Sequence, residues 1–193
     1  MIKLESDKWK EGYAYSVHTI YSIYVGEDEY GHSMYDTKRT PMGELLYQLK
    51  YKQNLSVLPN IIDLLKADST FLNFIKKDFV LLVPATNKNR KFQPVEVIAD
   101  AISKEFSIPV IKGMIEAENH TEIKHVEKAK KIDILKSSYT YSDYPEIDRN
   151  SNIIIFDDLY SSGSTMNVVA ELLNQNGFTN LYAFALTKTK NGD

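Results

Sequence analysis

The first forty residues alternate between apolar and polar positions, as expected for antiparallel β structure. Tyrosine and β-branched residues occupy one parity, which a strand would place on one face: Tyr13, Tyr15, Val17, Thr19, Tyr21, Ile23 and Val25. A polar turn at 26–31 leads into a weaker second strand. We predict that this segment lies outside the core sheet, with its tyrosines and Trp9 packed on one sheet face. The alternative is that these rings stack on a base or contact a partner.

Helical periodicity follows at residue 40. Thr40 and Pro41 predict an N-cap and a first helical residue, and Met42, Leu45, Leu46 and Leu49 recur at helical spacing. Lys50 and Lys52 then either close the helix C-terminus or bind a phosphate, and the pattern does not decide between these roles. Further helices are expected at 57–66 and 70–77.

Buried strands and helices alternate from residue 78 onward. Apolar runs predict strands at 79–84, 108–115, 152–157 and 181–187, separated by helical patterns near 95–106 and 165–176. Alternation of this kind predicts an α/β fold with a parallel core sheet flanked by helices. We expect one domain over 1–193, with an N-terminal β-hairpin and helical hood at 1–77 and an α/β core at 78–190.

Composition narrows the function classes. The chain is 43% hydrophobic and 25% charged, with a formal net charge of −3, which argues against nucleic-acid binding that depends on overall basicity. The absence of cysteine excludes disulfides, thiolate metal sites and thiol nucleophiles. The charged N-terminus is unlike a signal peptide, and no apolar run approaches the roughly 20 residues that span a bilayer. A cytoplasmic protein without a membrane partner is expected.

The most informative segment is 153–165, where a buried strand leads into two aspartates and then a small-residue loop. Asp157 and Asp158 are expected at the carboxyl end of the strand, where open α/β sheets bind ligands. The loop opens a helix with hydroxyls and free N–H groups that suit a phosphate, and comprises Ser161, Ser162, Gly163, Ser164 and Thr165. Two carboxylates can accept hydrogen bonds from a vicinal diol, directly or through a hydrated cation. Phosphate and diol together describe a ribose 5-phosphate.

A simpler interpretation is a solvated turn followed by an N-capping loop, because acidic pairs and Ser/Gly turns are each common. The order of strand, aspartate pair, hydroxyl loop and amphipathic helix is much rarer, and it favours the functional interpretation.

This segment resembles the phosphoribosyl-pyrophosphate (PRPP) binding motif of type I phosphoribosyltransferases, and the chain resembles their ComF family in particular. Supporting stretches are LLYQLKYK at 45–52, the loop at 84–87, the helix start at 90–99 and the polar stretch at 121–131, which takes the place of a flexible loop. Lys91 and Pro94 depart from the family pattern.

The resemblance implies a type I phosphoribosyltransferase-like fold and a role for each matching residue. Asp157 and Asp158 would hold the ribose hydroxyls, with Mg²⁺ bound indirectly through PRPP, and the loop 161–165 would bind the 5-phosphate. The pyrophosphate loop would comprise Ala85, Thr86, Asn87 and Lys88. Lys124 and His125 would act in catalysis by closing over the pyrophosphate, although the stretch 116–136 is equally interpretable as a solvated helical face.

The implied activity is transfer of ribose 5-phosphate from PRPP to an unidentified nucleobase or amine, with release of pyrophosphate. The alternatives are a non-catalytic PRPP- or nucleotide-binding regulator and an accessory DNA-processing factor. Nucleic-acid binding rests only on local lysines and the family association. A homodimer stays open, and the acceptor has no signature in the sequence.

Overall fold

The computed structural model describes residues 1–75, 78–84, 92–117 and 138–190. A six-stranded sheet forms its centre, with each pair of neighbours parallel except the outermost strand β1, which is antiparallel to β2. In spatial order the strands are β1 (Ile2–Lys3), β2 (Glu11–Val17), β10 (Leu181–Lys188), β9 (Asn152–Tyr160), β5 (Phe79–Val83) and β6 (Val110–Lys112). The prediction of an α/β fold with a mostly parallel sheet is confirmed.

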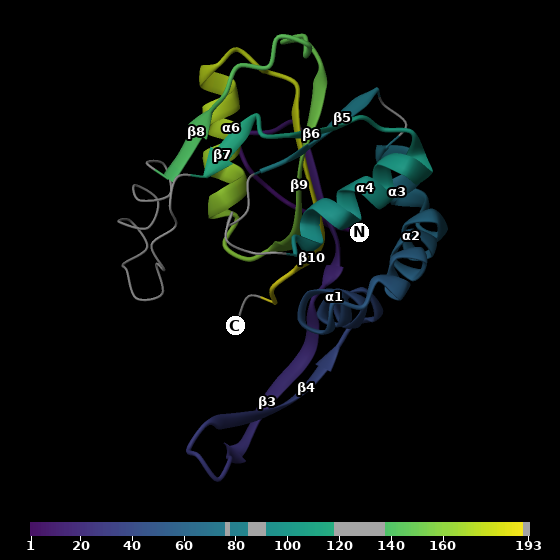
Figure 1. Cartoon of the computed structure of the whole chain (residues 1–193), viewed down its shortest axis with the longest axis vertical. Helices are drawn as coiled ribbons and strands as arrows, with labels where there is room; N and C mark the ends of the chain where they lie inside the picture. Colours follow the sequence, from purple (N-terminus) through teal and green to yellow (C-terminus); the bar gives the residue numbers. More distant parts are fainter. Residues whose placement is uncertain (76–77, 85–91, 118–137, 191–193) are drawn as a thin grey trace.

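Helices cover both faces of this sheet (Figure 1). One face carries α1 (Pro41–Lys52), the 3₁₀ turn η1 (Leu55–Val57), α2 (Leu58–Ala67), α3 (Ser69–Phe74) and α4 (Pro94–Phe106). The other face carries α6 (Ser164–Gln175) and a two-stranded ribbon of β7 (Ile115–Ala117) and β8 (Tyr139–Tyr141). Among the described residues, no helix has the length and apolarity needed to cross a membrane.

Strand β9 joins the two layers because it is buried on both faces. Ile154 and Phe156 pack with α1–α4, whereas Ile153 and Ile155 pack with α6, as the alternation of side chains along a strand requires. All four residues are at most 1% exposed. The continuous apolar run in the sequence therefore corresponds to a central strand.

The N-terminal prediction is wrong for residues 11–17, because β2 joins the core sheet. It pairs in parallel with β10, from Tyr182 opposite Glu11 to Lys188 opposite Val17. Without β2, the outer backbone groups of β10 would lack ladder partners, and an unpaired strand edge is a liability. The chain leaves the sheet at His18, whose N–H donates to the Lys188 carbonyl at 2.8 Å. The predicted single strand is therefore two strands in different sheets.

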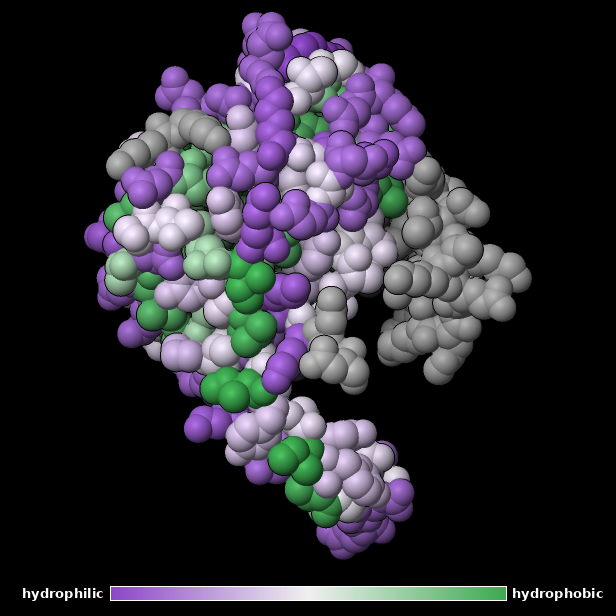
Figure 2. Space-filling model, turned by 180° about the vertical axis from the view of Figure 1, so that it is seen from behind, coloured by the Kyte–Doolittle hydropathy of each residue, from purple (hydrophilic) through white to green (hydrophobic). Residues whose placement is uncertain are grey.

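The second of these strands, β3 (Thr19–Glu27), pairs only with β4 (Ser33–Arg39) and forms a ribbon outside the core sheet. We call residues 19–39 the arm; it projects away from the body beside α1 (Figure 1). Figure 2 shows hydrophobic residues on its surface. Packing of the aromatic residues is confirmed for Trp9, which is 7% exposed, but is wrong for the arm, where four tyrosines are exposed: Tyr21, Tyr24, Tyr30 and Tyr35.

The strand predicted at 108–115 is also divided. Gly113 has a φ of +84°, a conformation that side chains rarely adopt, and the chain turns there from β6 into β7. β6 stays in the core sheet beside β5, whereas β7 pairs with β8 over the α6 layer. One apolar run therefore contributes strands to two different sheets.

The predicted start of α1 is confirmed, and it fixes the base of the arm. Thr40 Oγ1 accepts a hydrogen bond from the Gly43 N–H at 3.1 Å and donates one to the Val17 carbonyl at 2.6 Å. The same hydroxyl thus caps the helix and holds the residue at which β2 ends.

Replacing Thr40 by Ala should lower the free energy of unfolding by about 1–2 kcal/mol, because it removes both the helix cap and the contact with Val17. Thr40→Ser, which keeps the hydroxyl, is the matched control and should lose less than half of that amount. Urea unfolding followed by circular dichroism measures both variants. Equal losses in the two would mean that the hydroxyl does not hold this junction.

Candidate functional site

The two aspartates lie inside a strand and not after it, because β9 continues to Tyr160. Asp157 stands opposite Ala185 of β10 in the ladder. Neighbouring residues of a strand point to opposite faces, so Asp157 shares the α6 face with Ile155 and Asp158 shares the α1 face with Phe156. The predicted position at the strand end is thus wrong by a few residues, although both side chains lie near the carboxyl edge of the sheet.

On the α1 face, Asp158 forms an ion pair with Lys50. Lys50 Nζ lies 2.7 Å from Asp158 Oδ1, and the two side chains are 25% and 9% exposed, respectively. A charged hydrogen bond of this length between half-buried and buried groups is stronger than a surface ion pair. Lys50 therefore does more than close the C-terminus of α1, because it pairs with one of the two carboxylates.

On the α6 face, Asp157 has an unusually basic carboxyl group. Burial raises its pKa most, the negative charge of Asp158 adds to this, and the pKa reaches about 7. The Asp158 N–H, which donates to Asp157 Oδ1 at 2.8 Å, and the charge of Lys50 oppose the rise without cancelling it. Asp157 can therefore hold a proton near neutral pH.

Tyr139 of β8 lies beside Asp157. Burial raises the pKa of its phenol, and the Asp157 charge raises it further, whereas a hydrogen bond with the Thr165 side chain lowers it. Tyr139 is 7% exposed and so remains a neutral hydroxyl at physiological pH. It connects the carboxylate pair to the first turn of α6.

The hydroxyl loop turns directly from β9 into α6. Gly163 is the N-cap with a φ of +72°, and α6 begins at Ser164, one residue before the predicted start. A Cβ atom on Gly163 would collide with the Tyr160 hydroxyl, so the loop closes tightly over that ring. Gly163 offers no side-chain acceptor, and the Ser164 N–H donates only a long hydrogen bond of 3.4 Å to Ser162 Oγ. The start of α6 therefore still favours an anion.

A small cavity joins the loop to Asp157. Its volume is about 70 Å³, and its walls include Asp157, Tyr160 and the whole predicted phosphate loop 161–165. Ser162 and Ser164 hydroxyls lie 2.8 Å apart on its exposed side. The structure thus brings Asp157 together with the five loop residues that the sequence singled out, whereas Asp158 faces α1 on the other side of the sheet.

Two residues of this region were not assigned to the site by the sequence analysis. Thr187 of β10 is fully buried and donates from Oγ1 to the Asp158 carbonyl at 3.2 Å. His18 Nδ1 lies 3.1 Å from the same Thr187 hydroxyl. Burial lowers the pKa of His18, and the nearby charges of Lys50 and Arg39 lower it further, so its imidazole is neutral at pH 7. These contacts are tertiary and leave no spacing signal in the chain.

The remaining predicted residues lie outside the described residues. These are the pyrophosphate loop Ala85, Thr86, Asn87 and Lys88, and the pair Lys124 and His125. The strand before that loop is described: Leu82 of β5 pairs with Ile155 of β9, so β5 ends at the same sheet edge as the aspartates.

Whether a magnesium ion fits this site depends on the ligand that enters with it. The described residues contain no group of three or more acidic or histidine side chains suited to a metal. Mg²⁺ is commonly held by one or two carboxylates together with substrate phosphates, and Asp157, beside the loop 161–165, could supply one carboxylate. The residues thus suit a metal that enters with a phosphorylated ligand.

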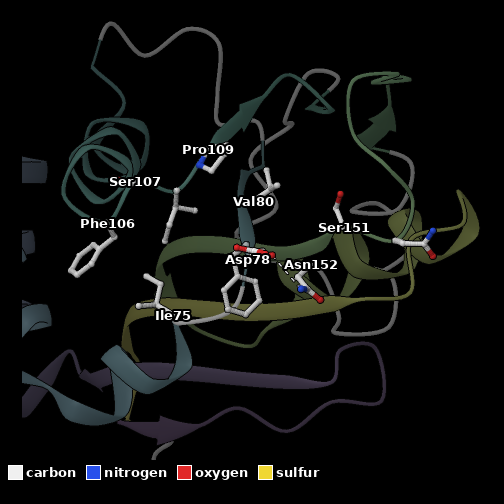
Figure 3. A pocket seen from close by; sticks show the side chains of 11 residues that line it. Ile75, Asp78, Val80, Phe106, Ser107, Pro109, Ser151 and Asn152 are labelled. Atoms are coloured by element: carbon white, nitrogen blue, oxygen red, sulfur yellow. Dashed lines mark hydrogen bonds between the residues drawn. The ribbon is translucent and has the colours of Figure 1, made fainter.

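A larger cavity of about 570 Å³ opens at the opposite edge of the sheet (Figure 3). It lies where β5 and β9 begin and α4 ends, with Asp78, Ser107, Pro109 and Asn152 among its walls. Asn152 Nδ2 donates to the Asp78 carbonyl at 3.2 Å across it. Because parallel strands carry their carboxyl ends at the other edge, this cavity is separate from the aspartate site.

In comparisons with known proteins, the chain matches no protein-family model and no curated protein.

The raised pKa of Asp157 predicts that the stability of the fold depends on pH. In the unfolded chain this carboxyl ionises near its ordinary value of 3.8, whereas in the folded protein it ionises near 7, so stability falls as pH rises between these values. Asp157→Asn should remove this cost and stabilise the protein by on the order of 1–2 kcal/mol at pH 8, but by much less at pH 4. Urea unfolding across this pH range measures the difference; a pH-independent difference would contradict the raised pKa.

Removing the partner of Lys50 should destabilise the fold. Asp158→Asn leaves a half-buried ammonium without its counter-charge, and we expect a loss of about 2–3 kcal/mol at pH 7. The double variant Lys50→Met with Asp158→Asn should recover at least half of that loss, because it removes the stranded charge. Thermal and urea unfolding of wild type, both single variants and the double variant test the pair. Strictly additive losses would show that the ion pair contributes nothing.

Proposed function

We propose that the protein is a PRPP-dependent phosphoribosyltransferase that transfers ribose 5-phosphate to a nucleobase or amine. One observation carries the proposal: Asp157 lines the cavity that the loop 161–165 and the first turn of α6 also line, and Asp158 follows it on the opposite face of β9. An anion site and a carboxylate are thereby adjacent, as phosphate and diol are in a ribose 5-phosphate. The resemblance of the same segment to the type I phosphoribosyltransferase motif supports the proposal independently of the geometry.

In this proposal, the loop binds the 5-phosphate through the N–H groups and hydroxyls at the start of α6, where the helix dipole favours negative charge. Asp157, which lines the same cavity as the loop, accepts hydrogen bonds from the ribose hydroxyls and becomes a charged acceptor when it releases its proton. The site thus holds the ligand through its phosphate and its ribose.

Displacement at C1 requires a leaving pyrophosphate and an incoming nitrogen nucleophile. The transition state resembles an oxocarbenium ion, so catalysis depends on positioning and electrostatic stabilisation more than on a protein nucleophile. Mg²⁺ held by the ligand phosphates would supply charge neutralisation of the departing pyrophosphate. The contribution of the chain is to orient the ribose 5-phosphate through the loop 161–165 and Asp157.

The Lys50 ion pair favours a second candidate, a PRPP or nucleotide sensor without transfer activity. A cation already lies 2.7 Å from Asp158, so a magnesium ion competes with Lys50 for this carboxylate. A sensor could use the neutralised pair to bind the ribose hydroxyls with little need for the metal. The two candidates therefore differ in magnesium dependence as well as in turnover.

Isothermal titration calorimetry tests the shared premise, that the site binds ribose 5-phosphate compounds. Wild-type protein should bind PRPP, and Asp157→Asn should weaken this binding about 10-fold or more, because it removes an acceptor that can become charged. Asp63→Asn, an exposed carboxylate of α2, is the matched control and should bind as wild type does. Absence of binding to PRPP, ribose 5-phosphate and AMP with Mg²⁺ present would overturn the proposal.

A pyrophosphate-release screen then separates the two candidates. Nucleobases and small amines are supplied with PRPP and Mg²⁺, and pyrophosphate is measured. Acceptor-dependent release that Asp157→Asn abolishes identifies a transferase. Retained PRPP binding that is insensitive to Mg²⁺, without release from any acceptor, identifies the sensor.

A further inference from the structure

The arm exposes more apolar surface than a free ribbon can stably carry. Isolated two-stranded hairpins are marginal in water, and they gain stability by packing against another surface. The arm residues Ile23, Tyr24, Val25 and Tyr35 are each 53–58% exposed, and the body of the molecule leaves them uncovered. Together they form an exposed apolar patch on a projecting element, which is typical of an interaction site.

Both faces of the ribbon carry these side chains. Tyr24 pairs with Tyr35 across the strands, with ring centroids 5.8 Å apart, and the neighbouring Ile23 pairs with Asp36. Adjacent cross-strand pairs lie on opposite faces, so one face presents the two tyrosines and the other presents Ile23. Packing one face against the body would still leave the other exposed, so the arm suits a partner that meets it away from the body.

The charges of the arm are separated along its length. Glu27 and Glu29 lie exposed at the tip, and neither forms an ion pair within the described part of the chain. The base carries the exposed Lys38 of β4 and Arg39, which pairs with Glu44 at 3.5 Å, and the adjoining helix α1 contributes Lys52. Asp36, which is exposed between tip and base, is the one acidic residue of β4. The acidic tip is therefore complementary to the lysines at the base of a second arm of opposite direction.

We propose that the arm is a homodimer interface, in which two copies pair their arms antiparallel about a two-fold axis. The tip of each arm then lies against the base of the other, so Glu27 and Glu29 approach Lys38 and Lys52 of the second copy. Tyr24 and Tyr35, which share one face of the ribbon, meet their counterparts of the second copy in the middle. A two-fold contact repeats every such pairing twice, which makes a modest patch effective.

The dimensions of the arm indicate that the base must also take part in the dimer interface. Nine residues of β3 extend about 30 Å, and a two-stranded face is about 10 Å wide, so one face offers roughly 300 Å². Stable interfaces bury about 800 Å² per partner. Arms that crossed only at their tips would fall well short, whereas full-length antiparallel pairing adds the second ribbon edge and the exposed Tyr51 ring beside Tyr47 at the base.

Sedimentation equilibrium of the whole chain from 1 to 100 μM tests the proposal. Wild type should be a dimer, and Tyr24→Ser with Tyr35→Ser should raise its dissociation constant about 100-fold, because the apolar centre of that face is lost. The matched control is Glu146→Lys, in the segment between β8 and β9 at the end of the molecule opposite the arm (Figure 1), and it should leave the dimer unchanged. Circular dichroism melts verify that each variant is folded.

Charge reversal tests the antiparallel arrangement. Glu27→Lys with Glu29→Lys should weaken the dimer about 10-fold, and Lys38→Glu with Lys52→Glu should do the same. All four substitutions together restore opposite charges at every contact and should recover most of the affinity. Monomeric wild type at 100 μM, an unaltered dimer in the arm variants, or a quadruple variant weaker than either double variant would each overturn the proposal. These measurements involve no ligand, so their outcome is independent of PRPP binding.

Discussion

The burial of β9 on both faces determines where every other feature of this molecule can lie. Ile153, Ile154, Ile155 and Phe156 are almost fully excluded from water, and they fill two separate cores through simple alternation. Each core needs its own helical layer, which α1–α4 and α6 supply. The same alternation continues past the apolar run, so it directs Asp157 toward one layer and Asp158 toward the other. The site is thus the polar end of β9, and its two carboxylates have different surroundings because they point to opposite faces of the sheet.

These surroundings give Asp157 and Asp158 different electrostatic environments, although both are aspartates of one strand. Asp158 faces a lysine, and Asp157 faces Tyr139 and the start of α6 without a counter-charge as close as Lys50 is to Asp158. Electrostatic coupling within the pair then favours a single shared proton at neutral pH, held on the carboxyl that lacks the close cation.

Helices and strands with strong local sequence signals could be predicted, whereas strand pairing and contacts between residues far apart in the chain could not. The cap at Thr40 and the apolar run 79–83 depend on neighbouring residues, and both were predicted correctly. The departure of the chain from the sheet at His18 was missed, because parity continues unbroken from Tyr13 to Val25 and only the free edge of β10 decides which residues join the core. The Lys50–Asp158 pair spans 108 positions and has no local signature. The loop 161–165 was recognisable because its residues are contiguous.

Helix α1 connects the two features that local patterns did not reveal. Its first turn is held by Thr40, which follows the last residue of the arm, and its last turn carries Lys50 at the aspartate site. Twelve helical residues span about 18 Å and transmit displacement as a nearly rigid rod. The position of the counter-charge on Asp158 therefore depends on the same junction, around Val17 and His18, that sets the direction of the arm. A sheet strand, a projecting ribbon and a site lysine are in this way fixed by one threonine hydroxyl and the helix that it caps.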